Sequence, residues 1–393
     1  MRRVSCAPCV LAVAAIIACA GPGHAPGLPD KPPAARAAIG TVELFAKLYD
    51  YMPTGVAVSR EGRVFASFPR WDDGMLYTVA EVSSDGTAVP YPSRAFNQPD
   101  PDDPQGSLYS VQSVVVDAED RLWLLDTGRI RSGPAGAGAA KLVAVDLASG
   151  AVVKTIIMPP EQVGPESYLN DVRLDLSQGT EGVAYLTDSS RGGILVVDIG
   201  TGAVMRRLED HPSGQPQDVE LVVEGEPFCV QPSPDAAPTP VKVAADGIAL
   251  SPKGDTLYYC PLTSRRLYGI ATAALRDPAL DEAALGAQVK ALGPKPAVDG
   301  MAMDQAGRLY LAAFEHNAVM CRLPDGTFQT IAQNARLLWP DSIAIGPDAC
   351  LYVTANQLHR QAQFHGGQDL RQRPFAIFRI KLEAAPAPPQ QGS

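Results

Sequence analysis

Four aspartates occupy equivalent positions in a repeated sequence pattern, and carboxylates placed in this way attract a cation. They are Asp171, Asp246, Asp299 and Asp341, and each opens an alternating apolar run. If these runs are strands that converge on one axis, the carboxylates form a ring of negative potential. Hard metal cations take carboxylate and amide oxygens, and an organic ammonium suits the same ring. The alternative interpretation is that an Asp before Gly or Ser only caps a local turn.

Other repeats and neighbouring loops add amide, aromatic and basic side chains to this candidate site. Equivalent positions hold Gln112 and Asn170, and loops expected at the same end carry Arg70 and Trp71. Arginines at the opening of an acidic channel suit a small amphoteric molecule. Its carboxylate would face outward, and its amine or a bound metal would face inward. Each of these charges is also consistent with a solvated loop.

Few other residues point to chemistry. The sequence has no GxSxG elbow, no P-loop and no HExxH motif. His316, His359 and His365 fall in the expected rim loops, where a general base and a solvated histidine are both consistent with the sequence. Residues 210–245 form a long, proline-containing connection, which we expect to pack over the mouth of the site as a lid.

The positions above are defined by a pattern that recurs six times. Each copy has a polar or small residue, an alternating apolar strand, a turn and a second strand of the type x-L-Y/W. The copies start 42 to 75 residues apart, which is the spacing of propeller blades. They occupy residues 54–67, 112–126, 171–188, 246–260, 299–313 and 341–355.

A third apolar strand follows each hairpin, and a fourth follows in most copies. The last copy has no fourth strand after residue 382, and residues 41–48 are the obvious strand to complete that sheet. The sequence therefore predicts an all-β fold over residues 39–383, a six-bladed β-propeller closed by the N-terminal strand joining the last blade. Two stacked sandwich domains are the alternative.

The first residues have the pattern of an export signal. Arg2 and Arg3 precede a short apolar run that ends at Cys19, which fits a bacterial lipobox. Residues 1–19 are thus expected to be a signal peptide and Cys19 a lipidation site, although cleavage after Ala25 is the alternative. Residues 20–38 would be a flexible tether and 384–393 a disordered tail. We expect a periplasmic or outer-membrane lipoprotein, or a secreted protein.

Charge and cysteine content limit the partners. The formal net charge is −10 and no basic stripe is present, so nucleic acid is excluded as a partner. Membrane contact is expected only through a lipid on Cys19. The folded part has four cysteines, which permit two disulfides or four buried thiols in strands. They are Cys229, Cys260, Cys321 and Cys350.

Several segments resemble the motif series of the major royal jelly/Yellow family. They include FPRWDDGMLYTVAEV (68–82), RLWLLDTG (121–128), YLNDVRLD (168–175), YLTDSSRGGILVVD (185–198), ADGIALSPKGDTLYYCPLTSRRLY (245–268) and LYVTANQL (351–358). The resemblance implies a secreted six-bladed propeller, with relatives linked to dopachrome conversion and to binding of biogenic amines in the central channel. It also implies that Asn170, Asp246, Asn317 and Asn356 line or border that channel.

A more distant similarity is to the senescence marker protein/gluconolactonase propellers, which hydrolyse lactones with one divalent metal. That similarity implies metal ligands at Asn170, Asp246 and Asp299 and a Ca²⁺ or Zn²⁺ cofactor. The chain departs from that family at Thr54 and Gln112, where the family has a Glu and an Asn.

These observations give three functional hypotheses. The first is an exported propeller that binds or converts a catechol amine, an indole amine or a dopachrome-like molecule in its channel, as a binding protein or an isomerase. The second is a metal-dependent lactonase, and the third is a non-catalytic scaffold for another envelope protein. No nucleophile and base pair stands out, so the sequence does not decide whether the protein is an enzyme.

Overall fold

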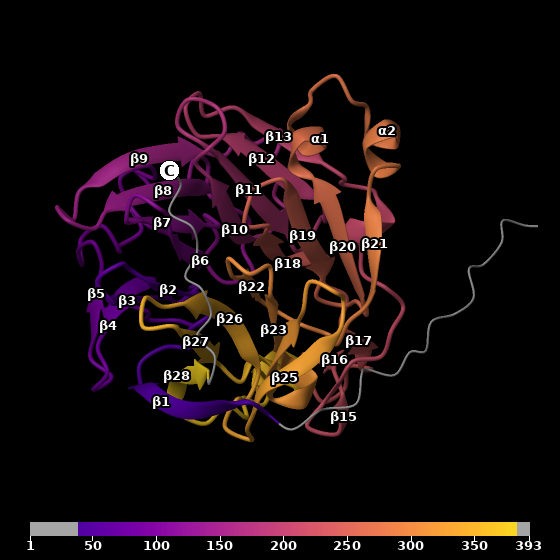
Figure 1. Cartoon of the computed structure of the whole chain (residues 1–393). Helices are drawn as coiled ribbons and strands as arrows, with labels where there is room; N and C mark the ends of the chain where they lie inside the picture. Colours follow the sequence, from indigo (N-terminus) through magenta and orange to yellow (C-terminus); the bar gives the residue numbers. More distant parts are fainter. Residues whose placement is uncertain (1–37, 383–393) are drawn as a thin grey trace, which may run out of the picture. The chain divides into compact units, whose positions relative to one another are not determined.

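Six four-stranded antiparallel sheets surround a common axis, as the sequence predicts (Figure 1). The structure is a computed structural model, and it describes residues 38–382. In each blade the strand that is named first below lies nearest the axis. From inside to outside, the first blade has β2 (Val56–Val58), β3 (Val64–Ser67), β4 (Val79–Val82) and β5 (Ala88–Pro90). The second blade has β6 (Val111–Val116), β7 (Arg121–Asp126), β8 (Lys141–Asp146) and β9 (Val152–Ile157). The third blade has β10 (Leu169–Asp175), β11 (Val183–Asp188), β12 (Ile194–Asp198) and β13 (Val204–Arg207).

The second half of the propeller repeats this order. The fourth blade has β18 (Ala245–Leu250), β19 (Thr256–Pro261), β20 (Arg266–Ala271) and β21 (Lys290–Pro294). The fifth blade has β22 (Met301–Met303), β23 (Leu309–Ala313), β24 (Ala318–Arg322) and β25 (Phe328–Gln333). The sixth blade has β26 (Pro340–Ile345), β27 (Cys350–Ala355), β28 (Phe375–Leu382) and β1 (Gly40–Leu48). Two short helices, α1 (Thr272–Arg276) and α2 (Glu282–Gly286), connect β20 to β21.

The N-terminal strand closes the ring, which confirms the prediction made from residues 41–48. Strand β1 is the outermost strand of the sixth blade and pairs antiparallel with β28, from Gly40 opposite Leu382 to Leu48 opposite Phe375. The backbone hydrogen bonds of this pairing join the two ends of the propeller and leave β28 with a partner on both sides.

Neighbouring blades are joined by apolar packing and by hydroxyl groups near the axis. Trp123 and Leu142 of the second blade, for example, pack in one buried cluster with Leu186 of the third. Hydroxyls on second strands donate to a backbone carbonyl that opens the next inner strand. These bonds are Ser67 Oγ to Gln112 O (2.8 Å), Thr187 Oγ1 to Asp246 O (2.8 Å) and Thr354 Oγ1 to Thr54 O (2.7 Å). They fix the residues at the start of the inner strands.

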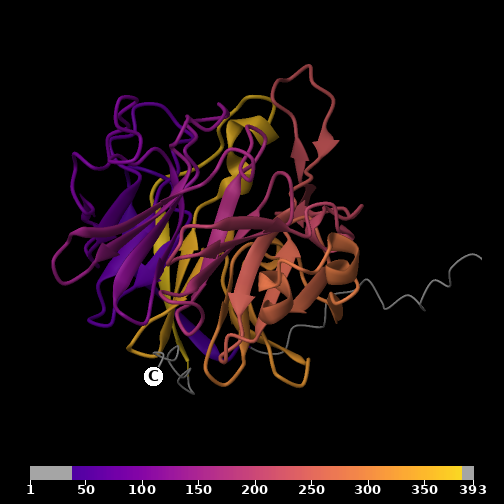
Figure 2. The ribbon, with the colours of Figure 1, turned by 90° about the horizontal axis from the view of Figure 1, so that it is seen from above.

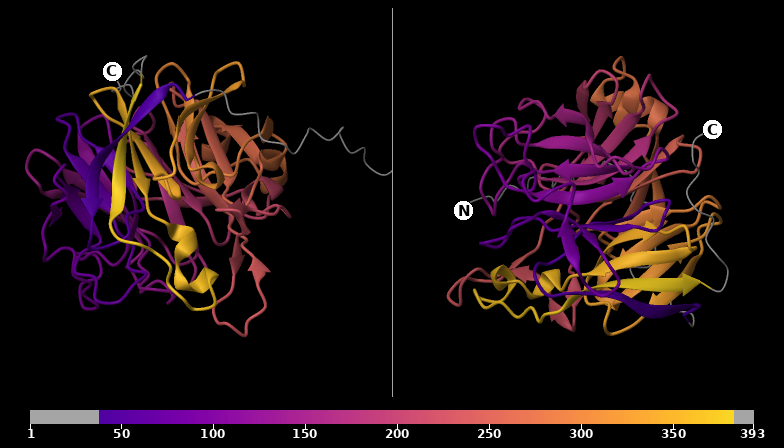
Figure 3. Two further views of the ribbon diagram at one scale, coloured as in Figure 1. Left: turned by 90° about the horizontal axis from the view of Figure 1, so that it is seen from below. Right: turned by 90° about the vertical axis from the view of Figure 1, so that its left-hand side faces the viewer.

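The long connection between the third and fourth blades packs at one face of the propeller. It contains the 3-10 turn η1 (Pro212–Gly214) and the strand pairs β14 (Val222–Val223) with β15 (Glu226–Pro227) and β16 (Cys229–Val230) with β17 (Thr239–Pro240). Figures 2 and 3 show it projecting from the same face as η3 (Leu358–Arg360) and η4 (Ala362–Phe364) of the sixth blade.

All four cysteines in the described part of the chain are free thiols, so the two-disulfide alternative is wrong. Cys260, Cys321 and Cys350 are buried in strands of three different blades, and Cys229 is half-buried in β16. Within residues 38–382 no helix is long and apolar enough to cross a membrane. The expected signal peptide, the lipidation site Cys19, the tether before residue 38 and the tail from 384 lie outside the described residues.

Candidate functional site

A cavity of about 650 Å³ lies where the inner strands begin, and we call it the upper cavity. The polar residues at its base open inner strands, because hydroxyl and backbone bonds between blades bring these strand starts together. Its walls are largely aromatic and come from loops and from the long connection. The polar residues at the base are Gln112, Asn170, Asp246, Asp299 and Asp341, and the aromatic ones are Trp71, Tyr168, Phe228, Trp339 and Phe364. Loops add further polar residues, among them the charged Asp72, Arg131, Asp369 and Arg371.

Three buried carboxyl groups form the acidic part of the upper cavity. Asp246, Asp299 and Asp341 are only 3%, 6% and 5% exposed. The Oδ2 atom of Asp299 accepts a hydrogen bond from Trp339 Nε1 (2.7 Å), and Asp341 Oδ2 accepts one from Asn356 Nδ2 (2.6 Å). Among the described residues, the buried Oδ1 atom of Asp246 has no hydrogen-bond partner. This oxygen is therefore available to a donor or a cation from outside the protein.

Burial and mutual repulsion raise the pKa values of this acidic cluster. Burial raises the pKa of Asp299 to about 6. The pKa of Asp246 lies well above its ordinary value because of burial and the carboxyls of Asp299 and Asp341, and burial with Asp299 raises the pKa of Asp341. Burial and mutual repulsion therefore favour keeping a proton on the Asp246–Asp299 pair. A bound cation would replace that proton.

Stacking and hydrogen bonds hold the aromatic walls in place. The Trp339 indole lies parallel to Phe314, with ring centroids 4.2 Å apart, and its other ring neighbours are Phe228 at 5.0 Å and His359 at 5.7 Å. On the opposite wall, Trp71 Nε1 donates to the Tyr168 hydroxyl (2.8 Å), which donates to Gln112 Oε1 (2.8 Å). These aromatic side chains are thus oriented before any ligand arrives.

The rim of the upper cavity is held by ion pairs between separate loops. Arg371 contacts both oxygens of Asp72 (3.0 and 3.1 Å) and also pairs with Asp369, which ties the β27–β28 loop to the first blade. The long connection supplies Phe228, Val241 and Val243 to the cavity wall, as expected for a segment at the mouth.

A salt bridge fastens the long connection to the sixth blade. Glu224 contacts His359 Nε2 (2.7 Å) and Arg360 Nη2 (2.6 Å). The Arg360 guanidinium lowers the pKa of Glu224 to about 2, and burial lowers the pKa of His359. His359 is therefore a buried member of the salt bridge between the long connection and the sixth blade, and it is not a solvated histidine.

The structure brings most of the predicted site residues together. Of the residues named from the sequence, Gln112, Asn170, Asp246, Asp299, Asp341 and Trp71 line the upper cavity. Asn356 is buried behind the cavity, where it holds Asp341 in place and accepts a hydrogen bond from the Leu358 N–H (2.9 Å).

Three predicted residues lie elsewhere. Asp171 points toward the other end of the channel and forms an ion pair with Arg173 (2.8 Å), because its side chain is on the opposite side of β10 from Asn170. Arg70 is buried and donates to the backbone carbonyls of Met75 and Asn97, so its guanidinium serves a loop rather than the cavity. Asn317 ends the 3-10 turn η2 (Phe314–His316) with a left-handed backbone and does not line the cavity.

Sequence reasoning missed Tyr168, Trp339, Phe228 and Arg371 as cavity residues. A signal was present for two of them. Tyr168 and Trp339 each stand two residues before a polar residue that opens an inner strand, and side chains two positions apart on an extended chain lie on the same side.

The upper cavity offers oxygen donors for a metal ion, but one of them is already engaged. Asn170, Asp246 and Asp299 all line it, and Asp246 Oδ1 is unpartnered. Asp299 Oδ2 is held by the Trp339 indole. Within residues 38–382 no three His, Cys, Asp or Glu side chains are arranged to hold a metal ion. The donor set matches an ammonium, which donates hydrogen bonds to a few oxygens, better than Ca²⁺, which takes six to eight oxygen ligands.

Solved structures with this fold come from several enzymes and binding proteins. A gluconolactonase from Xanthomonas campestris aligns over 89% of this chain and 92% of its own, with 14% identity and a TM-score of 0.52. Regucalcin, a calcium-binding protein from Agrobacterium tumefaciens, aligns over 88% and 98%, with 16% identity and a TM-score of 0.50. At these identities the likeness establishes the propeller fold alone.

Sequence relatives agree with the motif resemblance. Major royal jelly protein 7 of Apis mellifera is 27% identical over 218 residues, which are 53% of this chain and 46% of that protein. Protein yellow of Drosophila subobscura is 24% identical over 316 residues, 76% of this chain and 51% of that protein. The chain thus spans about half the length of these relatives. The family model for major royal jelly protein matches residues 109–388, so the chain belongs to the major royal jelly protein family.

Proposed function

We propose that this protein binds an aromatic amine in its upper cavity, as an exported member of the family. The catechol amines, indole amines and dopachrome-like molecules that the family resemblance implies combine a cationic or imino nitrogen with a flat ring. The observation that carries the proposal is the unpartnered, buried Asp246 Oδ1 within a cluster of three carboxyls under aromatic walls.

The two parts of such a ligand match two parts of the cavity. An ammonium group donates three hydrogen bonds, and the Asp246–Asp299 pair gains a charge partner when the ammonium displaces its shared proton. The ring of the ligand would pack between Trp339 and Phe228 on one side and Tyr168 on the other. A volume of about 650 Å³ accommodates a molecule of this size.

The same groups are suited to proton transfer, if the protein converts its ligand. Tautomerisation of a dopachrome-like molecule moves one proton from carbon to oxygen with no net change in composition. A group that titrates near neutral pH is best able to take up and return that proton, and Asp299 has a pKa of about 6. We therefore assign Asp299, with its partner Asp246, as the acid and base of that step.

Metal-dependent lactone hydrolysis is the second candidate, and the unpartnered Asp246 oxygen is the observation in its favour. Asn170, Asp246 and Asp299 would hold the divalent ion, which supplies Lewis-acid activation of a carbonyl when bound. The hydrogen bond from Trp339 to Asp299 ranks this candidate below the first.

Isothermal titration calorimetry with tyramine and tryptamine tests the proposal. We expect saturable binding at pH 7.5, and much weaker binding of the neutral analogues 4-ethylphenol and 3-ethylindole. Asp246→Asn and Asp299→Asn should abolish amine binding, whereas Asp235→Asn, an equal charge change at the exposed β16–β17 turn, should not.

The competing functions give different results in the same titrations. If Ca²⁺ or Zn²⁺ binds with a stoichiometry near one and the amines do not, the lactonase proposal replaces the first. If neither amines nor metal ions bind, the upper cavity does not have the proposed role and the scaffold hypothesis remains.

A further inference from the structure

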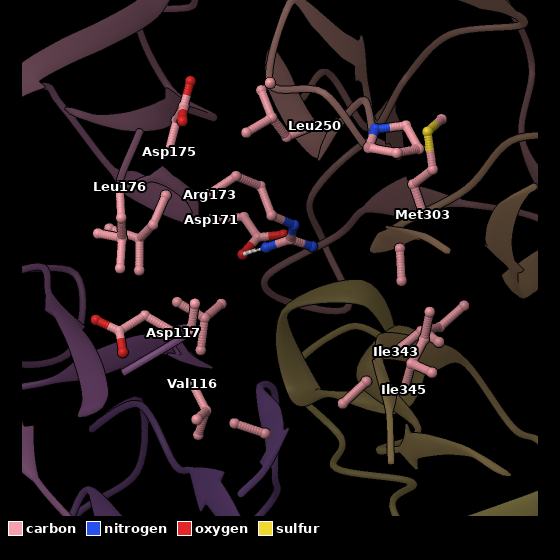
Figure 4. A pocket seen from close by; sticks show the side chains of 18 of the residues that line it. Val116, Asp117, Asp171, Arg173, Asp175, Leu176, Leu250, Met303, Ile343 and Ile345 are labelled. Carbon is pink, nitrogen blue, oxygen red and sulfur yellow. Dashed lines mark hydrogen bonds and ion pairs between the residues drawn. The ribbon is translucent and has the colours of Figure 1, made fainter. Parts of the chain in front are cut away.

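A second cavity, of about 430 Å³, lies at the opposite end of the channel, where the inner strands end. We call it the lower cavity. All six blades contribute to it, and Figure 4 shows aliphatic side chains from several blades arranged around the central guanidinium of Arg173. Nothing in the proposal for the upper cavity uses this site.

The walls of the lower cavity are aliphatic rather than aromatic. Half-buried side chains from the ends of inner strands and from the turns that follow them surround the opening, so their apolar surface faces the cavity. They include Val58, Val116, Leu176, Leu250, Met303 and Ile345. An apolar ligand body that displaces water from these walls would bind favourably, at roughly 25 cal/mol per Å² of apolar surface buried.

Arg173 forms the floor of the lower cavity and retains free donors. Its Nη1 donates to Asp171 Oδ1 (2.8 Å) and to the Val172 carbonyl (2.6 Å), and its Nη2 donates to the Met301 carbonyl on the fifth blade. Among the described residues Nε has no hydrogen-bond partner. The side chain is 18% exposed, so the guanidinium can donate to a ligand above it.

Two of the three carboxylates around this cavity, Asp117 and Asp171, are occupied by donors of the protein itself. Asp117 accepts from the N–H groups of Glu119 and Arg121 (2.9 and 3.0 Å), from Arg121 Nε (2.7 Å) and from Trp123 Nε1 (2.7 Å). Asp171 is paired with Arg173.

The remaining charged residues of the lining are Asp175 and Lys253. Asp175 Oδ1 accepts from the backbone N–H and the hydroxyl of Ser177, whereas its Oδ2 is buried against Gly254 and has no hydrogen-bond partner among the described residues. Lys253 is exposed at the rim, and within the described chain it has no ion pair or hydrogen bond. The lower cavity therefore offers cationic donors at Arg173 and Lys253, and its unpartnered carboxylate oxygen, Asp175 Oδ2, is buried.

We propose that the lower cavity binds a small amphipathic carboxylate, with its aliphatic body between the six inner strands and its carboxylate on Arg173 and Lys253. A carboxylate accepts the side-on pair of N–H groups that a guanidinium presents. The aliphatic walls select an alkyl body over the aromatic one expected in the upper cavity.

Sodium octanoate is the probe for this site, measured by calorimetry on the whole chain. Wild-type protein should bind it saturably, and octanol, which has the same body without the charge, about tenfold more weakly. Arg173→Gln should weaken binding about tenfold, and Lys253→Gln about threefold, since an exposed ion pair contributes up to about 1 kcal/mol. Lys290→Gln, an equal charge change on the exposed β21, should leave the affinity unchanged.

A second variant keeps the proposal testable if Arg173→Gln fails to fold, because Arg173 also joins two blades. Met303→Trp fills the lower cavity from β22 and should abolish octanoate binding. The proposal is overturned if octanoate does not bind, or if Met303→Trp and Lys253→Gln both bind it as the wild type does.

The two cavities can be told apart in one set of titrations. Asp246→Asn should leave octanoate affinity unchanged, and Met303→Trp should leave tyramine affinity unchanged. Octanoate binding that is lost in Asp246→Asn would place the carboxylate in the upper cavity and contradict this assignment.

Discussion

The two ends of the channel use the same kind of residue for opposite purposes. At the lower end, Asp117 accepts four hydrogen bonds from the backbone and from Arg121 and Trp123, and it holds a turn. At the upper end, Asp246 is 3% exposed and keeps one oxygen without a partner among the described residues. The lower end also has an unpartnered carboxylate oxygen, Asp175 Oδ2, which is buried against Gly254. An aspartate with enough internal donors, such as Asp117, stabilises the fold, whereas the unpartnered oxygen of Asp246 is free to bind a ligand.

The walls differ in the same way. The upper cavity has rings fixed by stacking and hydrogen bonds, such as Trp339 and Tyr168, beside carboxyls with raised pKa values. The lower cavity has flexible aliphatic side chains beside a guanidinium, as Figure 4 shows for Met303 and Arg173. These differences are the basis for proposing a flat cation at the upper end and an alkyl anion at the lower end.

The largest expected effect comes from removing charge at the upper end. Asp246→Asn should weaken tyramine binding at least thirtyfold, since the loss of a buried charge partner costs about 2 kcal/mol or more. The ligand-free variant should unfold at the same or a higher temperature than the wild type, because repulsion from Asp299 and Asp341 is relieved. Calorimetry and differential scanning calorimetry measure the two effects. A variant that binds tyramine normally would contradict the comparison.

An Asp-to-Asn substitution at the lower end should reduce stability rather than tyramine affinity. Asp117→Asn turns an acceptor of Arg121 and Trp123 into a donor, so we expect it to lower the free energy of unfolding by about 2 kcal/mol. It should not change tyramine affinity, because Asp117 does not line the upper cavity. Urea unfolding followed by tryptophan fluorescence gives the free energy, and an unchanged midpoint would show that these hydrogen bonds do not hold the turn.

Trp339→Phe should alter the acidity of the upper cluster while keeping the stack on Phe314. Without the indole N–H, the ionised form of Asp299 loses a hydrogen bond, and its pKa should rise by about one unit, or ~1.4 kcal/mol. The pH at which tyramine affinity reaches half its maximum should rise by the same amount. A profile identical to that of the wild type would mean that Trp339 serves only as a wall.

The smallest expected effect is the pH dependence of stability without ligand. Raised pKa values in the folded state mean that the cluster is most stable when protonated, and this contribution is lost as the pH rises through about 6. The unfolding temperature of the wild type should therefore fall by a few degrees more than that of Asp246→Asn between pH 5 and pH 7.5. Equal changes in the two proteins would argue against a protonated cluster.

Sequence patterns predict the parts of this molecule that depend on local periodicity. Alternating apolar residues and regular spacing predict six blades and the closing strand at residues 41–48. Equivalent positions at the start of strands predict the cluster of Asp246, Asp299 and Asp341.

The partners of individual polar side chains were not predictable in this way. Asp171 shares a repeat position with the other aspartates, but its partner is Arg173, whose guanidinium also reaches a carbonyl 128 residues away at Met301. Arg70 was expected on the rim because its loop lies at the same end as the starts of the inner strands, yet the backbone carbonyls of Met75 and Asn97 hold it inside. Which partner such a side chain meets depends on the course of the loops in space, and local periodicity does not contain that information.

The central claim is that an organic ammonium replaces a proton shared by Asp246 and Asp299. Calorimetric titration of tyramine near pH 6, in two buffers that differ in ionisation enthalpy, measures the protons released on binding. The account predicts release of up to about one proton per tyramine bound in the wild type, and affinity that rises from pH 5 to pH 7.5. Binding without proton release, at an affinity independent of pH over this range, would contradict it.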